Sequence, residues 1–336
     1  MAERLSDKLR EYLQTAQGRV VNLKDLRVEL RIDPNSPTWE SLGREMRRLV
    51  AEKIVRPSGR NDGVYKVVTQ VKPVRVFIKD RERRIPFQLF FPKDFDTGME
   101  MNFAEHIVIR EGDIITIGGV SNYGKTCLAL NFCGENIDYF PVLMGNEYTT
   151  RIGDTDLYEP TPRFINRLDN MDWIEWTNGN GEDKFVLLPV RDDYAEHIVK
   201  DRINIIDWIN LEGSKLYDIG KVMENIKAEV GRGIAIPVLQ KDETAPLPRG
   251  KSFVRDFSDC LLLVDKFTET ESLLTIDKVK EYTYPVIGRK FAFGIKEGIK
   301  IINFREITQC PTCHGKKWTR AGTPCDECNQ TGYINK

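Results

Sequence analysis

The sequence predicts an α/β protein built on a mostly parallel β-sheet with helices on both of its faces. The main observation is that short apolar runs alternate with helical patterns between residues 96 and 308, because such alternation is typical of parallel strands joined by helices. Helical patterns with a turn-rich hairpin precede this segment, and a cysteine-rich tail follows it. We therefore expect four consecutive segments, at residues 1–68, 69–95, 96–308 and 309–336.

The composition is that of a folded protein with more than one domain. Of its 336 residues, 40% are hydrophobic and 30% are charged, and the formal net charge is -1. This balance excludes a disordered or fibrous chain. No apolar run approaches the roughly 18 residues that a membrane span needs, and the first residues are charged rather than those of a signal peptide. We expect a cytoplasmic protein that does not contact a membrane.

Residues 1–68 combine three helical patterns with a hairpin. Leu9 and Leu13 fall on one face of the first helix. Asn22 is placed to cap the second helix, and Pro37 to begin the third. Two β-prone runs then flank the turn-rich sequence PSGRNDG. This order of elements resembles a winged helix-turn-helix domain.

The same segment is basic, with 14 Lys and Arg against 10 Asp and Glu, a net charge of +4. The resemblance implies that the third helix enters the major groove of DNA while the hairpin contacts phosphate. The candidate residues for nucleic-acid contact here are Arg44, Arg47, Arg48 and Arg60. Two alternatives stay open, since these arginines can form an ordinary solvated face and winged helices also bind other proteins.

Residues 69–95 contain several prolines among charged and apolar residues, which favours a basic linker with a strand or two. The central segment follows, and a helical face carrying Ile219, Met223 and Ile226 lies between two of its strands. The expected strands of this segment lie at residues 114–117, 141–144, 185–188, 203–206, 234–239, 261–264 and 273–276.

The sequence GVSNYGKT at residues 119–126 fits the phosphate-binding pattern GxxxxGK[ST]. An apolar strand leads into it and an apolar helix leads out, which is the context that this motif needs. Backbone N–H groups of such a loop surround the phosphates, Lys125 reaches the β and γ oxygens, and the Thr126 hydroxyl binds Mg²⁺. The predicted ATP-binding residues of the loop are Gly119, Ser121, Asn122, Tyr123, Gly124, Lys125, Thr126 and Cys127.

Asp207 ends the apolar run INIID and is the expected second magnesium ligand. It would lie at the carboxyl end of a buried strand, where ligands of open α/β sheets bind. The alternative is an aspartate that only ends a strand at a turn.

From the strand-plus-glutamate VLMGNE onward, the sequence resembles the RecA-like ATPases, in the branch of DnaB-type helicases and RadA-type repair proteins. The other signs are IIDWINL and then IAIPVLQ after a helix. The resemblance implies that Glu147 activates the attacking water, that Asp207 holds Mg²⁺, and that Gln240 senses the γ-phosphate. A positioned carboxylate and an amide donor suit these roles chemically. The alternative to a catalytic role for Glu147 is that it is only a neighbour of a helix N-cap.

The family also presents a Lys-x-Arg pair to the neighbouring subunit's nucleotide, and this chain has Lys278 and Lys280 there. Lysine lacks the planar, two-pronged contact of an arginine finger, so the pair is a departure. Arg289 is an alternative, as is a slow ATPase or a plain surface role for both lysines. The family also has a loop that faces DNA and binds it through basic residues. The candidates for this contact in the present chain are Lys241, Arg249, Lys251 and Arg255. The alternative is a basic loop that is only solvated.

The tail contains two CxxC pairs separated by eleven residues. Four thiolates in two short knuckles complete a structural zinc site, with Cys310, Cys313, Cys325 and Cys328 as ligands. The pairs resemble DnaJ-type CxxCxGxG knuckles, although Lys317 and Gln330 replace expected glycines. A redox-active dithiol is the alternative. The flanking His314 is expected to be a bystander.

The favoured interpretation is a DNA-dependent ATPase with ATP, Mg²⁺ and Zn²⁺ as cofactors, acting as a helicase or translocase in replication or recombination. The resemblance implies a homo-oligomeric ring or filament on single- or double-stranded DNA, possible replication or recombination partner proteins, and no membrane. The alternatives are a repair ATPase that remodels DNA without travelling on it, and a nucleotide-gated DNA-binding regulator with weak hydrolysis.

Overall fold

A computed structural model of the protein divides into two compact units, Met1–Arg83 and Arg84–Lys336. Arg60, a candidate for nucleic-acid contact, and residues 70–86 of the expected linker lie outside the described residues. The structure describes residues 4–58, 63–69, 87–145, 147–210 and 218–336.

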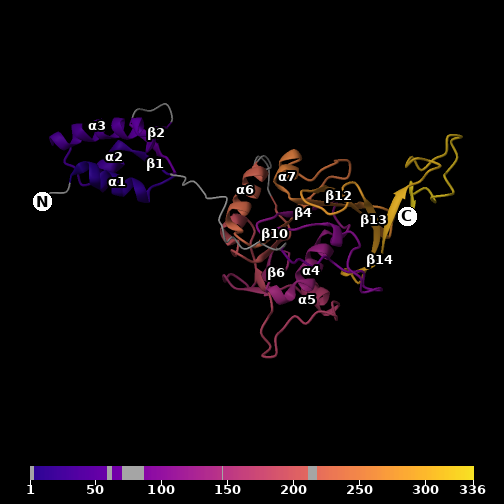
Figure 1. The fold of residues 1–336 in the computed structure, drawn as a ribbon. Coiled ribbons are helices and arrows are strands. Elements are labelled where there is room, and N and C mark those ends of the chain that lie inside the picture. Colours follow the sequence, from indigo (N-terminus) through magenta and orange to yellow (C-terminus); the bar gives the residue numbers. More distant parts are fainter. Residues whose placement is uncertain (1–3, 59–62, 70–86, 146, 211–217) are drawn as a thin grey trace, which may run out of the picture. The chain divides into compact units, whose positions relative to one another are not determined.

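Within its described part, the first unit packs three helices against a three-stranded antiparallel sheet with the order β1-β3-β2 (Figure 1). Leu9, Leu26 and Met46, one from each helix, are completely buried and form the centre of its core. The elements of this unit are α1 (Leu5–Thr15), β1 (Val20–Asn22), α2 (Leu23–Glu29), α3 (Pro37–Ala51), β2 (Val55–Pro57) and β3 (Val64–Val67).

The helices of the first unit begin where their sequence signals predict. The Asn22 side chain accepts a 2.8 Å hydrogen bond from the backbone N–H of Asp25 and caps α2. Pro37 lies in the first turn of α3, where its missing N–H costs nothing. The hairpin of β2 and β3 is also present. β1 was not expected, because a strand of three residues has too few positions to show an alternating pattern.

The second unit is built on a sheet with the order β15-β14-β13-β12-β11-β4-β10-β9-β5-β8. The strands from β11 to β8 run parallel, whereas β11 to β15 pair antiparallel. The sheet is therefore mixed, which corrects the expectation of a mostly parallel one. The physical reason is that the connections from β11 to β14 contain no helix and two of them are short loops, which can join only antiparallel neighbours, whereas β15 returns to β14 from the cysteine-rich tail.

Every strand expected in the central segment is present in the second unit. The strands are β4 (Ile115–Gly119), β5 (Val142–Met144), β8 (Val186–Leu188), β9 (Ile203–Ile206), β10 (Ile234–Gln240), β11 (Cys260–Lys266), β12 (Glu271–Val279), β13 (Lys290–Lys296), β14 (Lys300–Gln309) and β15 (Tyr333–Asn335), with β6 (Thr149–Arg151) and β7 (Tyr158–Pro160) in a separate hairpin. The α-helices are α4 (Lys125–Glu135), α5 (Pro162–Asp169), α6 (Ile219–Glu229) and α7 (Ser252–Phe257). In the described ranges no helix is both long and apolar enough to cross a bilayer.

Helices cover both faces of the parallel half of the sheet, as predicted. Neighbouring side chains of a strand point to opposite faces. Ile205 of β9 is buried in one apolar cluster with Leu128 of α4, whereas the adjacent Ile206 is buried in another with Met223 of α6. In Figure 1, α6 and α7 accordingly lie beside each other, apart from α4.

The expected linker ends earlier than the sequence suggested, because residues 87–95 pack on the second unit. Phe91 is only 2% exposed, and its ring lies 5.3 Å from that of Phe132 in α4. The backbone N–H of Phe95 donates to Ile301 O of β14 at 2.7 Å. Pro92 interrupts regular structure in this stretch but does not prevent burial, and proline content alone therefore placed the boundary too late.

Candidate functional site

The loop at residues 119–126 joins β4 to α4, in the strand–loop–helix context that the phosphate-binding motif requires. A Cβ atom at Gly119 would lie 2.4 Å from the backbone oxygen of Val264, so only glycine fits beside β11. Gly124 has φ +99°, and a Cβ there would lie 2.5 Å from Ile295 Cδ1. The glycines of the motif are therefore required by the path of the backbone at both ends of the loop.

Lys125 lies over the loop that precedes its helix. Its Nζ donates a 2.8 Å hydrogen bond to Val120 O. Burial lowers the pKa of Lys125, and the carboxylates of Asp207 and Glu147 oppose that shift. Lys125 thus interacts electrostatically with Asp207, the expected magnesium ligand, and with Glu147, the expected base. The three residues follow three different strands.

Asp207 directly follows β9 and is 3% exposed. Burial raises the pKa of its carboxyl group, and hydrogen bonding by Tyr148 and Thr126 partly offsets that rise. The Tyr148 hydroxyl donates to Oδ2, whereas Oδ1 is buried with no hydrogen-bond partner among the residues that the structure describes. A buried carboxylate oxygen without a partner, next to a threonine hydroxyl, fits the oxygen-ligand chemistry of Mg²⁺.

Gln240 and Glu147 lie at the ends of the two strands that flank β9. Gln240 is the last residue of β10, and Glu147 follows β5. Gln240 pairs with Gly119 across β10 and β4, and its Nε2 donates to Ser121 Oγ at 2.9 Å. It therefore contacts the loop directly. Glu147 follows β5 and is exposed, with its Oε1 accepting a 3.3 Å hydrogen bond from Trp208 Nε1. Parallel strand ends thus bring both predicted side chains to the loop's edge of the sheet.

The remaining loop residues differ in where their side chains lie. Ser121 and Asn122 are exposed, and Asn122 has φ +69°. Tyr123 is half-buried against the core. The Cys127 thiol faces inward, with its Sγ donating to Ile299 O at 3.1 Å, and burial raises its pKa to about 12. Only the backbone of Cys127 is therefore available to a phosphate.

Tyr148 is a further residue of the candidate site that was not predicted from the sequence. It is 1% exposed, and its ring lies 4.8 Å from that of Phe164 in α5. Its hydroxyl holds Asp207, which is 59 positions away in the sequence. The only sequence signal was its place directly after Glu147, because its partner became apparent only once β5 and β9 were seen to be neighbours.

The two lysines expected at a neighbouring nucleotide are bound to groups of this chain. Lys278 Nζ donates to Arg255 O at 2.6 Å, and Lys280 Nζ pairs with Asp259 at 3.0 Å. Lys278 aligns with Leu261 at the start of β11, the end of the sheet opposite the phosphate-binding loop. They cannot act on the loop of their own chain.

Arg289, the alternative finger, is paired as well. It forms a two-pronged ion pair with Glu306, at 3.0 Å and 2.7 Å. Its side chain is 17% exposed. The pairing fixes the guanidinium inside the antiparallel half of the sheet, so Arg289 is not presented to a neighbour.

The predicted nucleic-acid residues fall in two places. Arg44, Arg47 and Arg48 are exposed on α3, and Arg48 forms an ion pair with Glu45 at 3.0 Å. In the second unit, Lys251 is exposed before α7.

The other basic side chains of that loop are engaged. Arg255 pairs with Asp277 at 3.1 Å and Arg249 lies 3.7 Å from Asp242. Lys241 is 6% exposed and pairs with Asp265 at 2.5 Å, which removes it as a free contact.

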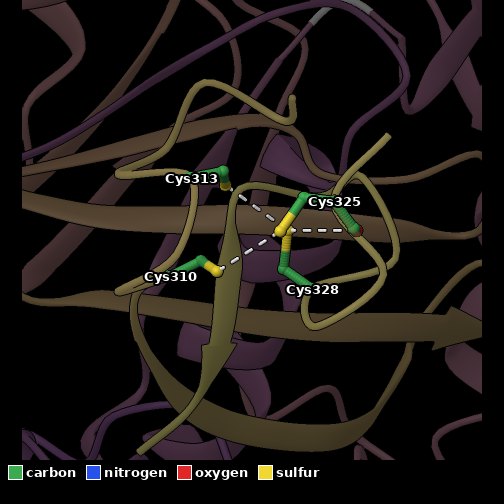
Figure 2. A group of neighbouring side chains, drawn as sticks. All are labelled: Cys310, Cys313, Cys325 and Cys328. Carbon is green, nitrogen blue, oxygen red and sulfur yellow. Dashed lines mark hydrogen bonds between the residues drawn. The ribbon is translucent and has the colours of Figure 1, made fainter. Parts of the chain in front are cut away.

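The four tail cysteines gather into one buried cluster, as the CxxC spacing predicts (Figure 2). Their sulfur atoms all lie within 4.8 Å of one another, with Sγ–Sγ distances of 3.8 Å for Cys310–Cys325 and 3.6 Å for Cys313–Cys328. A zinc ion with Zn–S bonds of about 2.3 Å sets tetrahedral edges of about 3.8 Å. The cluster therefore has the dimensions of a closed four-thiolate site. His314 is exposed and is not part of it.

Both knuckles repeat one backbone conformation. Gly315 and Lys317 after the first pair have φ +79° and +69°, and Gln330 and Gly332 after the second have +60° and +86°. Lys317 and Gln330 thus adopt the left-handed conformation at the two positions where the DnaJ-type pattern has glycine. The backbone N–H of Gly332 points to Cys328 Sγ at 3.3 Å, a donor that suits a thiolate.

The strand that follows the second knuckle ties the cluster to the rest of the unit. β15 pairs antiparallel with β14 at the edge of the sheet. Lys336 Nζ pairs with Glu306 at 2.8 Å. The cysteine cluster is therefore anchored on the sheet, not on a free tail.

No protein-family model matches the chain, and no curated protein matches it in sequence. Among solved structures, it is similar to the KaiC-like protein PH0186 from the archaeon Pyrococcus horikoshii OT3, with 17% identity and a TM-score of 0.44 over 65% of this chain and 97% of that one. It is also similar to the RadB recombinase, with 14% identity and a TM-score of 0.40 over 57% and 91%. The functional assignment therefore rests on the residues of this chain.

Proposed function

We propose that the chain is a P-loop ATPase of the RecA-like kind, in which nucleic acid stimulates ATP hydrolysis. One observation supports this above the others. Buried Asp207, one of whose carboxylate oxygens has no hydrogen-bond partner among the described residues, lies beside Thr126 at the end of a loop that fits GxxxxGKT completely. A loop that resembled the motif by chance would not bring a buried, half-satisfied carboxylate to its threonine.

The side chains would divide the work as follows. Lys125 would hold the terminal phosphates, and Thr126 with Asp207 would hold Mg²⁺. Bound Mg²⁺ would supply charge neutralisation on the phosphate oxygens. Glu147, oriented by Trp208 Nε1, would position a water molecule. Gln240 would sense the γ-phosphate through its contact with Ser121 and transmit the change to the loop that directly follows β10 and carries Lys251.

As output we propose helicase or translocase action by a homo-oligomeric ring or filament on DNA, in replication or recombination. The exposed arginines of α3 support a DNA contact, because a basic helix after a short helix pair is the reading surface of a winged helix. With α2 before α3 and the hairpin of β2 and β3 after it, the first unit has the element order of such a domain.

A second candidate is a nucleotide-gated DNA-binding regulator with weak hydrolysis. The observation that favours it is the pairing of both Lys278 and Lys280 with groups of their own chain. A motor needs a cation that the neighbouring subunit can present to the phosphates. If both lysines stay engaged, turnover would be slow and ATP would act as an assembly signal.

The test is phosphate release from MgATP with and without single-stranded DNA, combined with mass measurement of the assembly. Strong stimulation in a ring supports the motor, and tight ATP binding with little turnover supports the regulator. Glu147→Gln should keep ATP binding and lose turnover, whereas the matched control Glu105→Gln, a glutamate 77% exposed outside the site, should change neither. Absence of ATP binding, or normal turnover in Glu147→Gln, would contradict the proposed site.

A further inference from the structure

The segment between the two CxxC pairs, residues 314–324 with the sequence HGKKWTRAGTP, forms a basic finger. It holds three cationic residues, Lys316, Lys317 and Arg320, and no acidic residue. All three are exposed, and so is its one aromatic residue, Trp318, with 51% of its surface accessible. Tryptophan is highly buried on average, so the exposed ring of Trp318 is a candidate binding surface.

The finger is an ordered hairpin. Trp318 and Pro324 form an antiparallel bridge, and the backbone N–H of Thr319 donates to Thr323 O at 2.8 Å. The hydroxyls of the same two threonines lie 2.8 Å apart, and Cys325 N–H donates to Lys317 O at 3.0 Å. The cysteine cluster closes the base. The backbone that carries Trp318 is thus held in place, and little backbone conformational entropy would be lost when the finger binds a partner.

The positive charge of the finger is not neutralised within the part of the chain that the structure describes. Lys316, Lys317 and Arg320 form no ion pair or side-chain hydrogen bond there. Elsewhere in the second unit, by contrast, cations such as Arg289, Lys336 and Arg305 are paired with carboxylates. The acidic residues of the tail, Asp326 and Glu327, lie beyond Cys325, and Glu327 accepts a hydrogen bond from Thr312.

We propose that this finger binds single-stranded nucleic acid, with Trp318 stacking on an unpaired base and the three cations contacting phosphates. Unneutralised cations around one exposed aromatic ring are the combination that single-strand binding uses. A duplex hides the faces of its bases, and the centre of a protein–protein interface is depleted in lysine. This site is separate from the ATP site and does not depend on hydrolysis.

The direct test is fluorescence anisotropy of a labelled thymidine oligonucleotide of about 20 nucleotides with the full-length, zinc-loaded chain. Trp318→Ala should weaken binding about 5- to 150-fold, because loss of one base stack accounts for that range. Trp318→Phe should retain most of the affinity. Joint Lys316→Gln and Lys317→Gln should reduce the salt dependence of binding, by about 0.7 in slope for each phosphate that a lysine no longer neutralises.

The controls separate binding from folding. Zinc content of Trp318→Ala must equal that of the wild type. Tyr284→Ala removes an aromatic side chain that is 60% exposed outside the tail, and it should bind as the wild type does. An unchanged affinity of Trp318→Ala for the single strand would overturn the proposal and would leave a protein as the partner of the finger. An equal loss of affinity for a duplex of the same length would also overturn it.

Nucleic acid bound at the first unit would hide the contribution of the finger to the measured affinity. A second measurement therefore locates the contact itself. Photo-cross-linking with an iodouracil-substituted single strand should modify the peptide that contains Trp318. Cross-links confined to other peptides would refute the assignment. Because the Lys125→Ala variant should lose ATP turnover and keep this cross-link, failure of the ATPase proposal and failure of the finger proposal give different results.

Discussion

Replacement of Tyr148 by phenylalanine tests whether the tyrosine hydroxyl holds Asp207, the proposed magnesium ligand. Burial raises the pKa of Tyr148 well above its ordinary value, so the hydroxyl is a neutral donor to Asp207. The ring, packed on Phe164, would stay in place, and only the hydroxyl would be lost. Because Oδ1 of Asp207 already has no hydrogen-bond partner among the described residues, the change would leave Thr126 as the remaining side-chain donor to the carboxylate.

The magnitude follows from the charge of the acceptor. A hydrogen bond to a charged group contributes about 1.5 to 3 kcal/mol to the free energy of unfolding. For a unit of this size, 1 kcal/mol corresponds to a shift of about 2 to 4 °C in Tm. We expect the Tm of the second unit to fall by about 3 to 12 °C. The Mg²⁺ concentration for half-maximal ATP turnover should rise, because Asp207 would be less well oriented.

Thermal unfolding by calorimetry and an Mg²⁺ titration of phosphate release are the assays. Tyr194→Phe is the matched control, since Tyr194 is also buried but donates to backbone oxygens, Arg191 O at 2.7 Å and Trp208 O at 3.3 Å, and not to the Asp207 carboxylate. That variant should lose stability and keep its Mg²⁺ requirement. If Tyr148→Phe changes neither quantity, or if both variants shift the Mg²⁺ requirement equally, the hydroxyl does not position Asp207.

Three further predictions concern the tail and acid stability. Lys317→Gly and Gln330→Gly should each raise the stability of the zinc-bound tail by about 1 kcal/mol, measured by resistance to chelator, because both residues have positive φ; a loss of resistance would contradict this. Removal of zinc by a chelator should unfold the tail and increase hydrogen exchange in β15, and unchanged exchange would show that the cysteines do not hold a metal. Burial would raise the pKa of Asp259, but Lys227, a backbone N–H and Lys280 outweigh it and hold that pKa below its usual range. The resulting stabilisation is full above the ordinary carboxyl pKa of about 4 and is lost as the pH falls through the pKa of Asp259 in the folded protein. The difference in Tm between the wild type and Asp259→Asn should therefore disappear in acid. A difference that is independent of pH would argue against the pairing.

The parallel half of the sheet could be predicted from sequence because its strands are short, predominantly apolar runs. β9, for example, is buried along its whole length and shows as the run INII. The antiparallel half was less visible, because β14 has a mixed pattern of exposure and draws its neighbour β15 from within the cysteine tail. Local sequence cannot specify such pairing between distant segments.

The candidate site divides in the same way. Asp207 and Gln240 could be predicted because each ends an apolar strand, and parallel strands end at one edge of a sheet. Tyr148 could not, since its role depends on the adjacency of β5 and β9. The pairing of Lys241 with Asp265, and of Arg289 with Glu306, was equally invisible, because ion pairs between distant segments follow from the topology.

The most direct test of the phosphate-binding assignment is calorimetric titration of ATP into the full-length chain, with Mg²⁺ and with a metal chelator. We expect Lys125→Ala to abolish binding in both conditions. Asp207→Asn should remove only the additional affinity that Mg²⁺ provides. If ATP binds the wild type and both variants alike, or binds none of them, the loop at residues 119–126 and Asp207 do not form a nucleotide site.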